Sequence, residues 1–234
     1  MKSYNELKLA QELIRFPTVK TVDKGIMNFL SKKLTAIGFK CKIIKSQVTG
    51  SKPALNLFAK LGNSKPHINF LGHTDVVANL NYWKIPPFIG LVRKGYLNGR
   101  GSQDMKGGIA CWISAVSNFI KKNKFKGSIS IIISADEETT GLGTPAVMKY
   151  LKKRGEKIDF SIVGEPSSNR KVGDEIRIGR RGSMNAKLTV YGKSGHSAFY
   201  GTYINPCTTL AKIIAKLKST SLDNGTKFMP PSNL

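Results

Sequence analysis

The stretch "GSISIIISADEETTG", residues 127–141, places three adjacent carboxylates directly after a run of apolar residues. Residues 128–133 form a short, isoleucine-rich run, which is typical of a buried β-strand. The chain has 234 residues but only 14 acidic ones, so Asp136, Glu137 and Glu138 in a row concentrate its negative charge. Adjacent carboxylates repel one another, and burying an unpaired charge is costly. The stretch therefore predicts a compensating cation at the end of a buried strand.

Strands and helices alternate on both sides of this stretch. Apolar or alternating segments predict strands at 39–45, 54–61, 67–71, 128–133 and 158–163. Helical periodicity predicts helices at about 3–16, 25–37, 105–120 and 144–153. A capping box of Ser3 and Glu6 opens the first helix and Pro17 ends it, while Gly38 stops the second. This order predicts an α/β domain in which helices flank a central sheet.

The pattern changes near residue 170, so we expect a first domain at 1–169 and a second, smaller α+β domain at 170–234. Alternation from Met184 to Tyr191 predicts a strand of a hairpin, and Asn205-Pro206 predicts the cap and first turn of a helix. One hairpin with one helix leaves an apolar face uncovered. The last residues also lack the pattern of a natural ending, so we expect both domains to be incomplete.

The charge distribution favours a lysine-rich, solvated surface over a nucleic-acid-binding face. The net charge is +24, but the lysines are scattered through predicted helices and loops instead of lying together with aromatic residues. Nucleic-acid binding requires basic residues clustered on one face. A basic surface still attracts anionic small molecules.

The cysteines and the hydropathy pattern indicate a cytoplasmic protein. Cys41, Cys111 and Cys207 are odd in number and far apart, so neither a disulfide framework nor a Cys-x-x-Cys metal site is expected. The first residues carry charges in every turn, and no stretch reaches 18 uncharged apolar residues. We therefore expect no signal peptide and no membrane span.

Four polar groups follow predicted strands or precede a helix, where sites form in α/β sheets. They are His73 with Asp75, then Asp104, the acidic triplet and Glu165. Each has a simpler explanation by itself: a histidine bonded to backbone, a helix cap, a solvated loop and an exposed turn. Together, one imidazole and several carboxylates suit two divalent metals with a water between them, and one carboxylate remains as a general base. Motifs of serine hydrolases and nucleotide-binding loops are absent from the sequence.

The order of these motifs resembles the zinc-dependent aminoacylase and carboxypeptidase family. The matching segments are "GHTDVV", "WKIPPF", "GRGSQDMKGG", "DEE", "GEPSS", "GRRGS" and "GHSA". The pattern is most similar to members that release succinate from N-succinyl-diaminopimelate, on the route to diaminopimelate and lysine. The resemblance implies a mixed sheet in a catalytic domain, a lid domain that forms a homodimer, and two zinc ions, or cobalt in their place.

The resemblance also implies a role for each site residue. His73 and Glu165 would bind one metal, Glu138 the other, and Asp104 would bridge the two. Asp75 would hold His73, and Glu137 would take a proton from the bridging water and give it to the leaving amine. In the second domain, Arg180 would bind a substrate carboxylate. His196 would reach the neighbouring subunit's site and stabilise the tetrahedral oxyanion.

The chain also departs from the family pattern. It covers about the first three-fifths of that pattern and lacks the later histidine that completes the metal site of Asp104 and Glu138. His67, at the start of a predicted interior strand, is expected to be structural. The alternatives are a deacetylase acting on N-acetylornithine or a related carboxypeptidase, an inactive truncated product, and a basic nucleic-acid-binding protein. From the missing ligand we expect weakened binding of one metal and low activity from these 234 residues.

Overall fold

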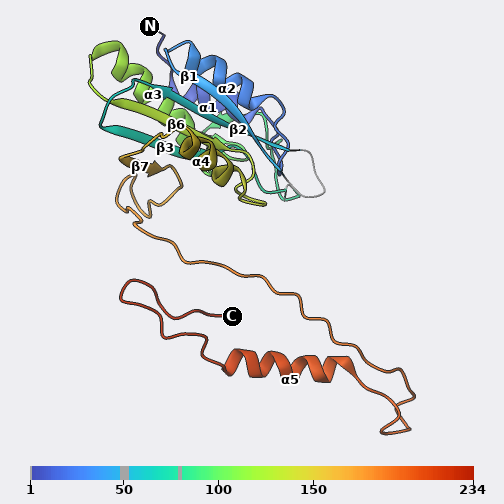
Figure 1. Ribbon diagram of the computed structural model, residues 1–234. Coiled ribbons are helices and arrows are strands. Elements are labelled where there is room, and N and C mark those ends of the chain that lie inside the picture. The colour runs from blue at the N-terminus through green and yellow to red at the C-terminus, as the bar shows by residue number, and fades with distance from the viewer. Residues whose placement is uncertain (1, 48–52, 79–80) are drawn as a thin grey trace. The chain divides into compact units, whose positions relative to one another are not determined.

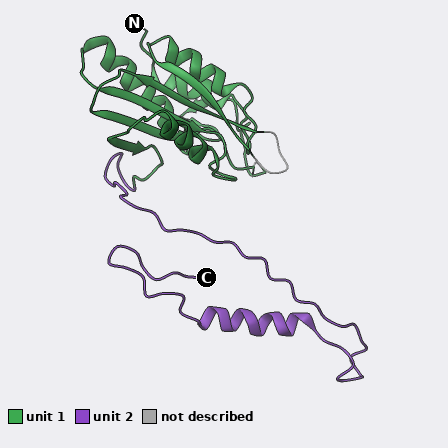
Figure 2. Ribbon diagram, in the orientation of Figure 1, with its two compact units in different colours: residues 1–168 green, residues 169–234 purple. Residues whose placement is uncertain are grey.

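The computed structural model describes residues 2–47, 53–78 and 81–234 (Figure 1). The chain divides into two units, residues 1–168 and residues 169–234 (Figure 2). Among the described residues, every buried hydrophobic side chain belongs to the first unit. The first unit therefore holds the hydrophobic core.

The first unit is built on a mixed five-stranded sheet in the order β1-β2-β6-β3-β7. The strands are β1 (Lys40–Ser46), β2 (Ala54–Leu61), β3 (His67–His73), β6 (Ser128–Ser134) and β7 (Phe160–Val163). β3 pairs in parallel with both β6 and β7, whereas β2 pairs antiparallel with β1 and β6. The predicted α/β class and the mixed sheet are confirmed.

β6 lies in the middle of the sheet, and all seven of its residues are buried. Successive side chains of a strand point to opposite faces of the sheet. Ile131 and Ile133 accordingly belong to the large core on one face, and Ile132 to a smaller core on the other. The continuous apolar run in the sequence reflects burial on both faces.

Helices cover both faces of the sheet (Figure 1). The large core contains residues of α1 (Glu6–Ile14), α2 (Ile26–Thr35) and α3 (Lys106–Lys122), and the smaller core contains residues of α4 (Gly143–Lys153). Each helix has apolar residues along one side, so only that side is buried. None of the helices in the described ranges is long and apolar enough to cross a membrane.

The start of α1 differs from the expectation. Asn5, not Ser3, is the N-cap, and its side chain accepts a hydrogen bond from the backbone N–H of Lys8 at 2.9 Å. Asn and Ser are comparably good caps, so the sequence pattern could not rank them. The end of α2 is as predicted, because Gly38 adopts a positive φ of 96° just beyond the helix.

A short hairpin was missed in the segment rich in proline and glycine. β4 (Leu91–Arg93) pairs antiparallel with β5 (Tyr96–Asn98). The two residues between them, Lys94 and Gly95, both have positive φ, as the tight turns of two-residue hairpins require. Strands of three residues are too short to show a periodic pattern.

The second unit corrects the expected hairpin. Residues 184–191 form no strand, and Met184 and Leu188 are exposed. Alternation marks a chain that can pair, but a strand also needs a partner, and the described part of this unit offers only an isolated bridge between Lys193 and Ile204. The helix is as predicted: α5 (Pro206–Ser219) begins after Asn205, whose side chain accepts from the N–H of Cys207. The assignment of residues 170–234 as a lid domain stays a prediction.

Removing a buried side chain from the central strand should lower the stability of the first unit. We expect Ile131→Ala to lower the free energy of unfolding by about 3 kcal/mol, because Ile131 is fully buried and its removal leaves a cavity. Ile214→Ala in α5, where Ile214 is 51% exposed, should change it by at most about 0.5 kcal/mol. Urea unfolding followed by tryptophan fluorescence measures this, since both tryptophans, Trp83 and Trp112, lie in the first unit. Equal effects of the two substitutions would contradict this account of the core.

Candidate metal centre

Three parallel strands end at the same edge of the sheet. In the parallel register His73 pairs with Ser134, and Leu71 pairs with Val163. The residues that follow these strand ends therefore converge, as the carboxyl ends of parallel strands do in α/β sheets. Asp75, the acidic triplet and Glu165 all follow these strands.

His73 stands at the centre of a group of carboxylates. Its Nε2 lies 2.9 Å from Asp104 Oδ1, 3.5 Å from Glu165 Oε1 and 3.9 Å from Glu137 Oε2. The His73 side chain is only 2% exposed, whereas those of Asp104 and Glu137 are 50% and 43% exposed. The centre is therefore buried on the imidazole side and open to solvent on the carboxylate side.

Two sets of side chains have the spacing of metal ligands. One is His73 with Asp104 and Glu138, and the other is His73 with Glu137 and Glu165; in each set the ligand atoms lie within 4.8 Å of one another. The structure thus brings together all four predicted ligands, and it also places Glu137, the predicted base, beside them. Which of the two adjacent glutamates binds metal stays a prediction.

The electrostatics of the group favour a divalent cation. Burial lowers the pKa of His73, but the hydrogen bond and charge of Asp75, with the charges of Glu165 and Glu137, outweigh it and raise the pKa from 6.5 to about 9. Burial and the nearby charge of Asp104 raise the pKa of Glu138. Both shifts result from negative charge gathered in a partly buried place. One imidazole nitrogen with several carboxylate oxygens is a donor set that fits zinc and similar divalent ions.

Asp75 does more than the sequence predicted. The Nδ1 atom of His73 lies 3.0 Å from the backbone oxygen of Asp75 and 3.5 Å from its carboxylate. The two oxygens of that carboxylate accept hydrogen bonds from the backbone N–H groups of Glu137 at 3.1 Å and Glu138 at 2.9 Å. Asp75 therefore orients the imidazole mainly through its backbone, while its carboxylate fixes the acidic triplet.

Asp136 has a structural role. It is fully buried and accepts hydrogen bonds from the hydroxyls of Ser134 and Thr140 and from the N–H groups of Leu142 and Gly143. A buried carboxylate is tolerated when it is bonded in this way. Asp136 thus connects the end of β6 to the start of α4 and holds the loop that carries Glu137 and Glu138.

Gly164 sets the position of Glu165. A Cβ atom at residue 164 would collide with the ring of Phe70 and lie 2.8 Å from the terminal methyl of Met105. The N–H of Gly164 donates to the carbonyl oxygen of Leu71 at 2.9 Å. Glycine therefore lets the chain after β7 stay close to β3, which brings Glu165 toward His73.

The other buried histidine is structural. His67 is 2% exposed, with Nδ1 at 2.8 Å from the backbone oxygen of Lys157 and Nε2 at 2.8 Å from Ser130 Oγ. Both ring nitrogens therefore have partners in the sheet and the adjoining loop. The expectation of a structural role for His67 is confirmed.

Lys106 is a buried cation near the centre that the sequence analysis did not single out. Burial lowers the pKa of its ammonium to about 7, and the charge of Asp75 opposes that shift. Its neighbour Gly107 packs closely, because a Cβ at residue 107 would collide with the carbonyl oxygen of Ser102. The sequence "DMKGG" therefore indicated a crowded place, but not that Lys106 is buried there.

The two site residues predicted in the second unit are exposed. His196 accepts a hydrogen bond on Nδ1 from the N–H of Ala198 and packs its ring against Phe199, with centroids 5.7 Å apart. Arg180 lies in a segment without helix or strand. Their predicted contacts with substrate stay predictions.

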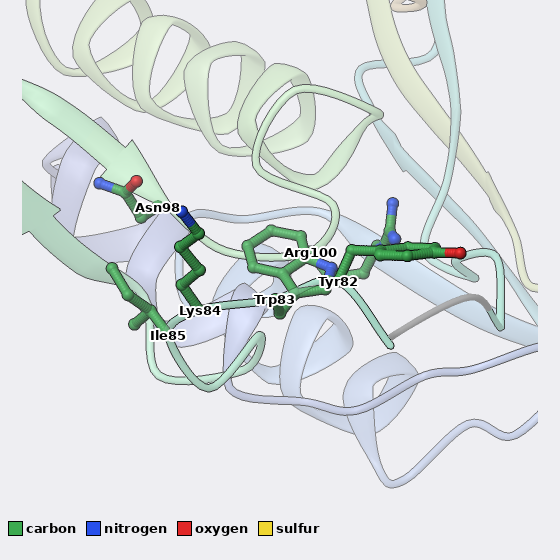
Figure 3. A pocket seen from close by; sticks show the side chains of 6 residues that line it. All are labelled: Tyr82, Trp83, Lys84, Ile85, Asn98 and Arg100. Carbon is green, nitrogen blue, oxygen red and sulfur yellow. The ribbon is translucent and has the colours of Figure 1, made fainter.

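A separate cavity of about 290 Å³ lies on the first unit (Figure 3). Its lining comprises Tyr82, Trp83, Lys84, Ile85, Asn98 and Arg100. The guanidinium of Arg100 lies over the Trp83 ring, 5.3 Å from its centroid. None of the lining residues belongs to the two ligand groups, so this cavity is distinct from the metal-ligand cluster.

A family comparison agrees with this geometry. The sequence profile of peptidase family M20/M25/M40 matches residues 70–231, which is more than half of the chain. The chain belongs to peptidase family M20/M25/M40. Metallopeptidases of the M20 family depend on bound metal, and the two groups around His73 are the candidates for holding it.

Relatives in the M20 family include named enzymes. The chain is 50% identical to a succinyl-diaminopimelate desuccinylase of Pelagibacter ubique, over all of this chain and 62% of that protein. It is 44% identical to one of Ehrlichia canis, over 97% of this chain and 60% of that protein. The chain thus spans about 60% of the length of these curated relatives.

Solved structures support the M20 fold. A tripeptidase of Staphylococcus aureus matches with a TM-score of 0.63 and 20% identity, over 95% of this chain and 59% of that one. Human carnosine dipeptidase 1 matches with a TM-score of 0.58 and 23% identity, over 68% of this chain and 38% of that one. At these identities the likeness concerns the fold.

The two buried histidines provide a matched test of the centre. We expect His73→Gln to weaken Co²⁺ binding by at least about tenfold, because it removes the nitrogen common to both ligand groups. His67→Gln should leave cobalt affinity unchanged and lower only the stability, since its partners are structural. Titration followed by visible absorption of Co²⁺ measures affinity. An equal loss of cobalt affinity in both variants would contradict the assignment of His73, and not His67, as a metal ligand.

Proposed function

We propose that this protein is the metal-binding part of an amide hydrolase that releases succinate from N-succinyl-diaminopimelate, in diaminopimelate and lysine biosynthesis. The observation that carries the proposal is the convergence of His73 with four carboxylates at one edge of the sheet. The substrate follows from the names of the relatives, which are desuccinylases at 40–50% identity over nearly the whole chain.

The ligand roles are assigned from the motif order, and the residues involved all lie in the two groups around His73. His73 and Glu165 would hold one metal, Glu138 would hold the other, and Asp104 would contribute to both. We take the metals to be two zinc ions, with cobalt as a substitute. Bound divalent ions would polarise the amide carbonyl and lower the pKa of a water molecule. Asp75 keeps the His73 ring and the acidic loop in place through its bonds to both.

Glu137 acts as the general base and acid. One of its carboxylate oxygens accepts a proton from the attacking water, whose oxygen forms the new bond to the acyl carbon. The same carboxyl group then gives the proton to the amine nitrogen as the C–N bond breaks. The products are succinate and the free amine. The 43% exposure of Glu137 leaves room for substrate beside it.

Charge complementarity favours a substrate of this class. The chain carries a formal charge of +24, and N-succinyl-diaminopimelate has three carboxylates and one ammonium, hence a net negative charge. We assign Arg180 to a substrate carboxylate and His196 to the developing oxyanion, on the match of their motifs. We also propose a homodimer through residues 170–234, and a cytoplasmic location in keeping with three free cysteines.

The substrate proposal can be tested with a chimera. Residues 1–234 of this chain would be followed by the remaining segment of the Pelagibacter ubique desuccinylase, because that relative is longer. We expect metal-dependent hydrolysis of N-succinyl-diaminopimelate at a kcat/KM well above that for N-acetylornithine. The unaltered relative is the positive control. A folded, metal-loaded chimera that prefers N-acetylornithine would overturn the choice of substrate.

The two adjacent glutamates should separate chemistry from metal binding. In the chimera we expect Glu137→Gln to lower kcat by at least about a hundredfold while metal stays bound, because a base is lost and not a ligand. Glu138→Gln should lower metal content. Metal analysis beside turnover measures both. The reverse result, with metal lost only from Glu137→Gln, would exchange the two roles.

A further inference from the structure

Lys106 has a fully buried side chain in the first turn of α3. Its Nζ donates a hydrogen bond to the backbone oxygen of Phe16 at 2.7 Å and lies 6.0 Å from the centroid of the Phe88 ring. Burying an ammonium group is costly, and a methylene chain alone could fill this space. The hydrogen bond to Phe16 is therefore the feature that distinguishes lysine from an apolar residue here.

The carbonyl that receives this bond begins a short segment, residues 16–20, that runs beside the His73 loop. Thr18 Oγ1 donates to the backbone oxygen of Thr74 at 2.5 Å. The N–H of Val76 donates to the oxygen of Thr18 at 3.0 Å, and the N–H of Lys20 to the oxygen of Val76 at 3.1 Å. Phe16 also accepts from the N–H of Thr18 at 2.9 Å. We call residues 16–20 the strap.

The strap joins two parts of the metal centre. At one end Lys106 lies two residues after Asp104, and at the other Thr74 and Val76 enclose Asp75, next to His73. The packing between these parts is tight: a Cβ at Gly101 would lie 3.0 Å from Val76 Cγ1 and 3.1 Å from Lys106 Cδ. A shift of Lys106 would therefore move the loop of Asp104 relative to the loop of His73.

We propose that Lys106 is a positioning residue of the metal centre: through the strap, its ammonium fixes the distance between Asp104 and His73. The inference rests on the proposed function, because it assumes that Asp104 and His73 share a metal. Preorganised ligands bind a metal more tightly, since less ordering remains to be done on binding. Lys106 thus acts on the metal without touching it.

Ser114 offers a matched control for a purely structural contact. It also lies in α3, is 3% exposed, and donates from Oγ to the backbone oxygen of Tyr4 at 2.7 Å. Tyr4 precedes α1 and Phe16 follows it, so Ser114 and Lys106 make the same kind of α3-to-backbone bond at opposite ends of α1. Ser114→Ala should lower the stability of the chain and leave the positions of the metal ligands unchanged.

The experiment measures Co²⁺ affinity, the visible spectrum of bound Co²⁺ and the urea midpoint of the metal-free chain for each variant. We expect Lys106→Met to weaken cobalt binding about 10- to 100-fold, as loss of groups that orient ligands does, and to alter the spectrum. Ser114→Ala should change only the urea midpoint. Wild-type affinity and spectrum in Lys106→Met would overturn the proposal.

Thr18→Val tests the strap itself and keeps the test decisive if Lys106→Met does not fold. Valine matches threonine in shape but cannot donate to Thr74, so cobalt affinity should fall. In the double variant, Lys106→Met with Thr18→Val, the fold-loss of cobalt affinity should be smaller than the product of the two single fold-losses, because both substitutions act through one segment. Fold-losses of cobalt affinity that simply multiply in the double variant, or no loss in Thr18→Val, would contradict the role of the strap. If His73→Gln weakens cobalt binding but Lys106→Met does not, only this inference is overturned. If His73→Gln leaves cobalt affinity unchanged, both this inference and the proposed function are overturned.

Discussion

The parallel pairing of β3 with β6 and β7 is the constraint from which the site follows. Parallel strands deliver their carboxyl ends to one edge, so His73, the acidic triplet and Glu165 converge although up to 92 residues separate them in the chain. Asp75 adds a direct connection, since its carboxylate bonds to the backbone of Glu137 and Glu138 beyond β6. The sheet thus sets the approximate geometry and Asp75 refines it.

Gathering carboxylates at one edge has an electrostatic cost that the protein meets in two ways. The two most buried acids, Asp75 and Asp136, accept hydrogen bonds from backbone N–H groups or hydroxyls. Such bonds stabilise an ionised carboxylate without a counter-ion. The remaining acids face the imidazole of His73, where a divalent cation would offset their repulsion. The acids with a structural role therefore bond to backbone N–H groups or hydroxyls, and the acids available to bind metal face His73.

Most strands and helices could be predicted because their signals are local. The apolar run at 128–133 and the helical periodicity of α2, α3 and α4 depend on neighbours within a few residues. The failed strand predictions have two physical causes. Residues 184–191 alternate correctly but have no partner strand among the described residues of their unit, and the strands of the β4–β5 hairpin are too short for a periodic signal.

Motif order and strand ends are properties of the chain, so the amino-acid sequence alone shows which residue types are available for chemistry. It identified His73, Asp75, Asp104, the acidic triplet and Glu165 in advance. Which partner each of these groups bonds to depends on the folded chain. Asp136, expected to support the loop, bonds to the start of α4, the carboxylate of Asp75 bonds to the triplet, and Lys106 is buried against the carbonyl of Phe16. Such partners lie 2 to 90 residues away, and the packed fold holds them within hydrogen-bonding distance.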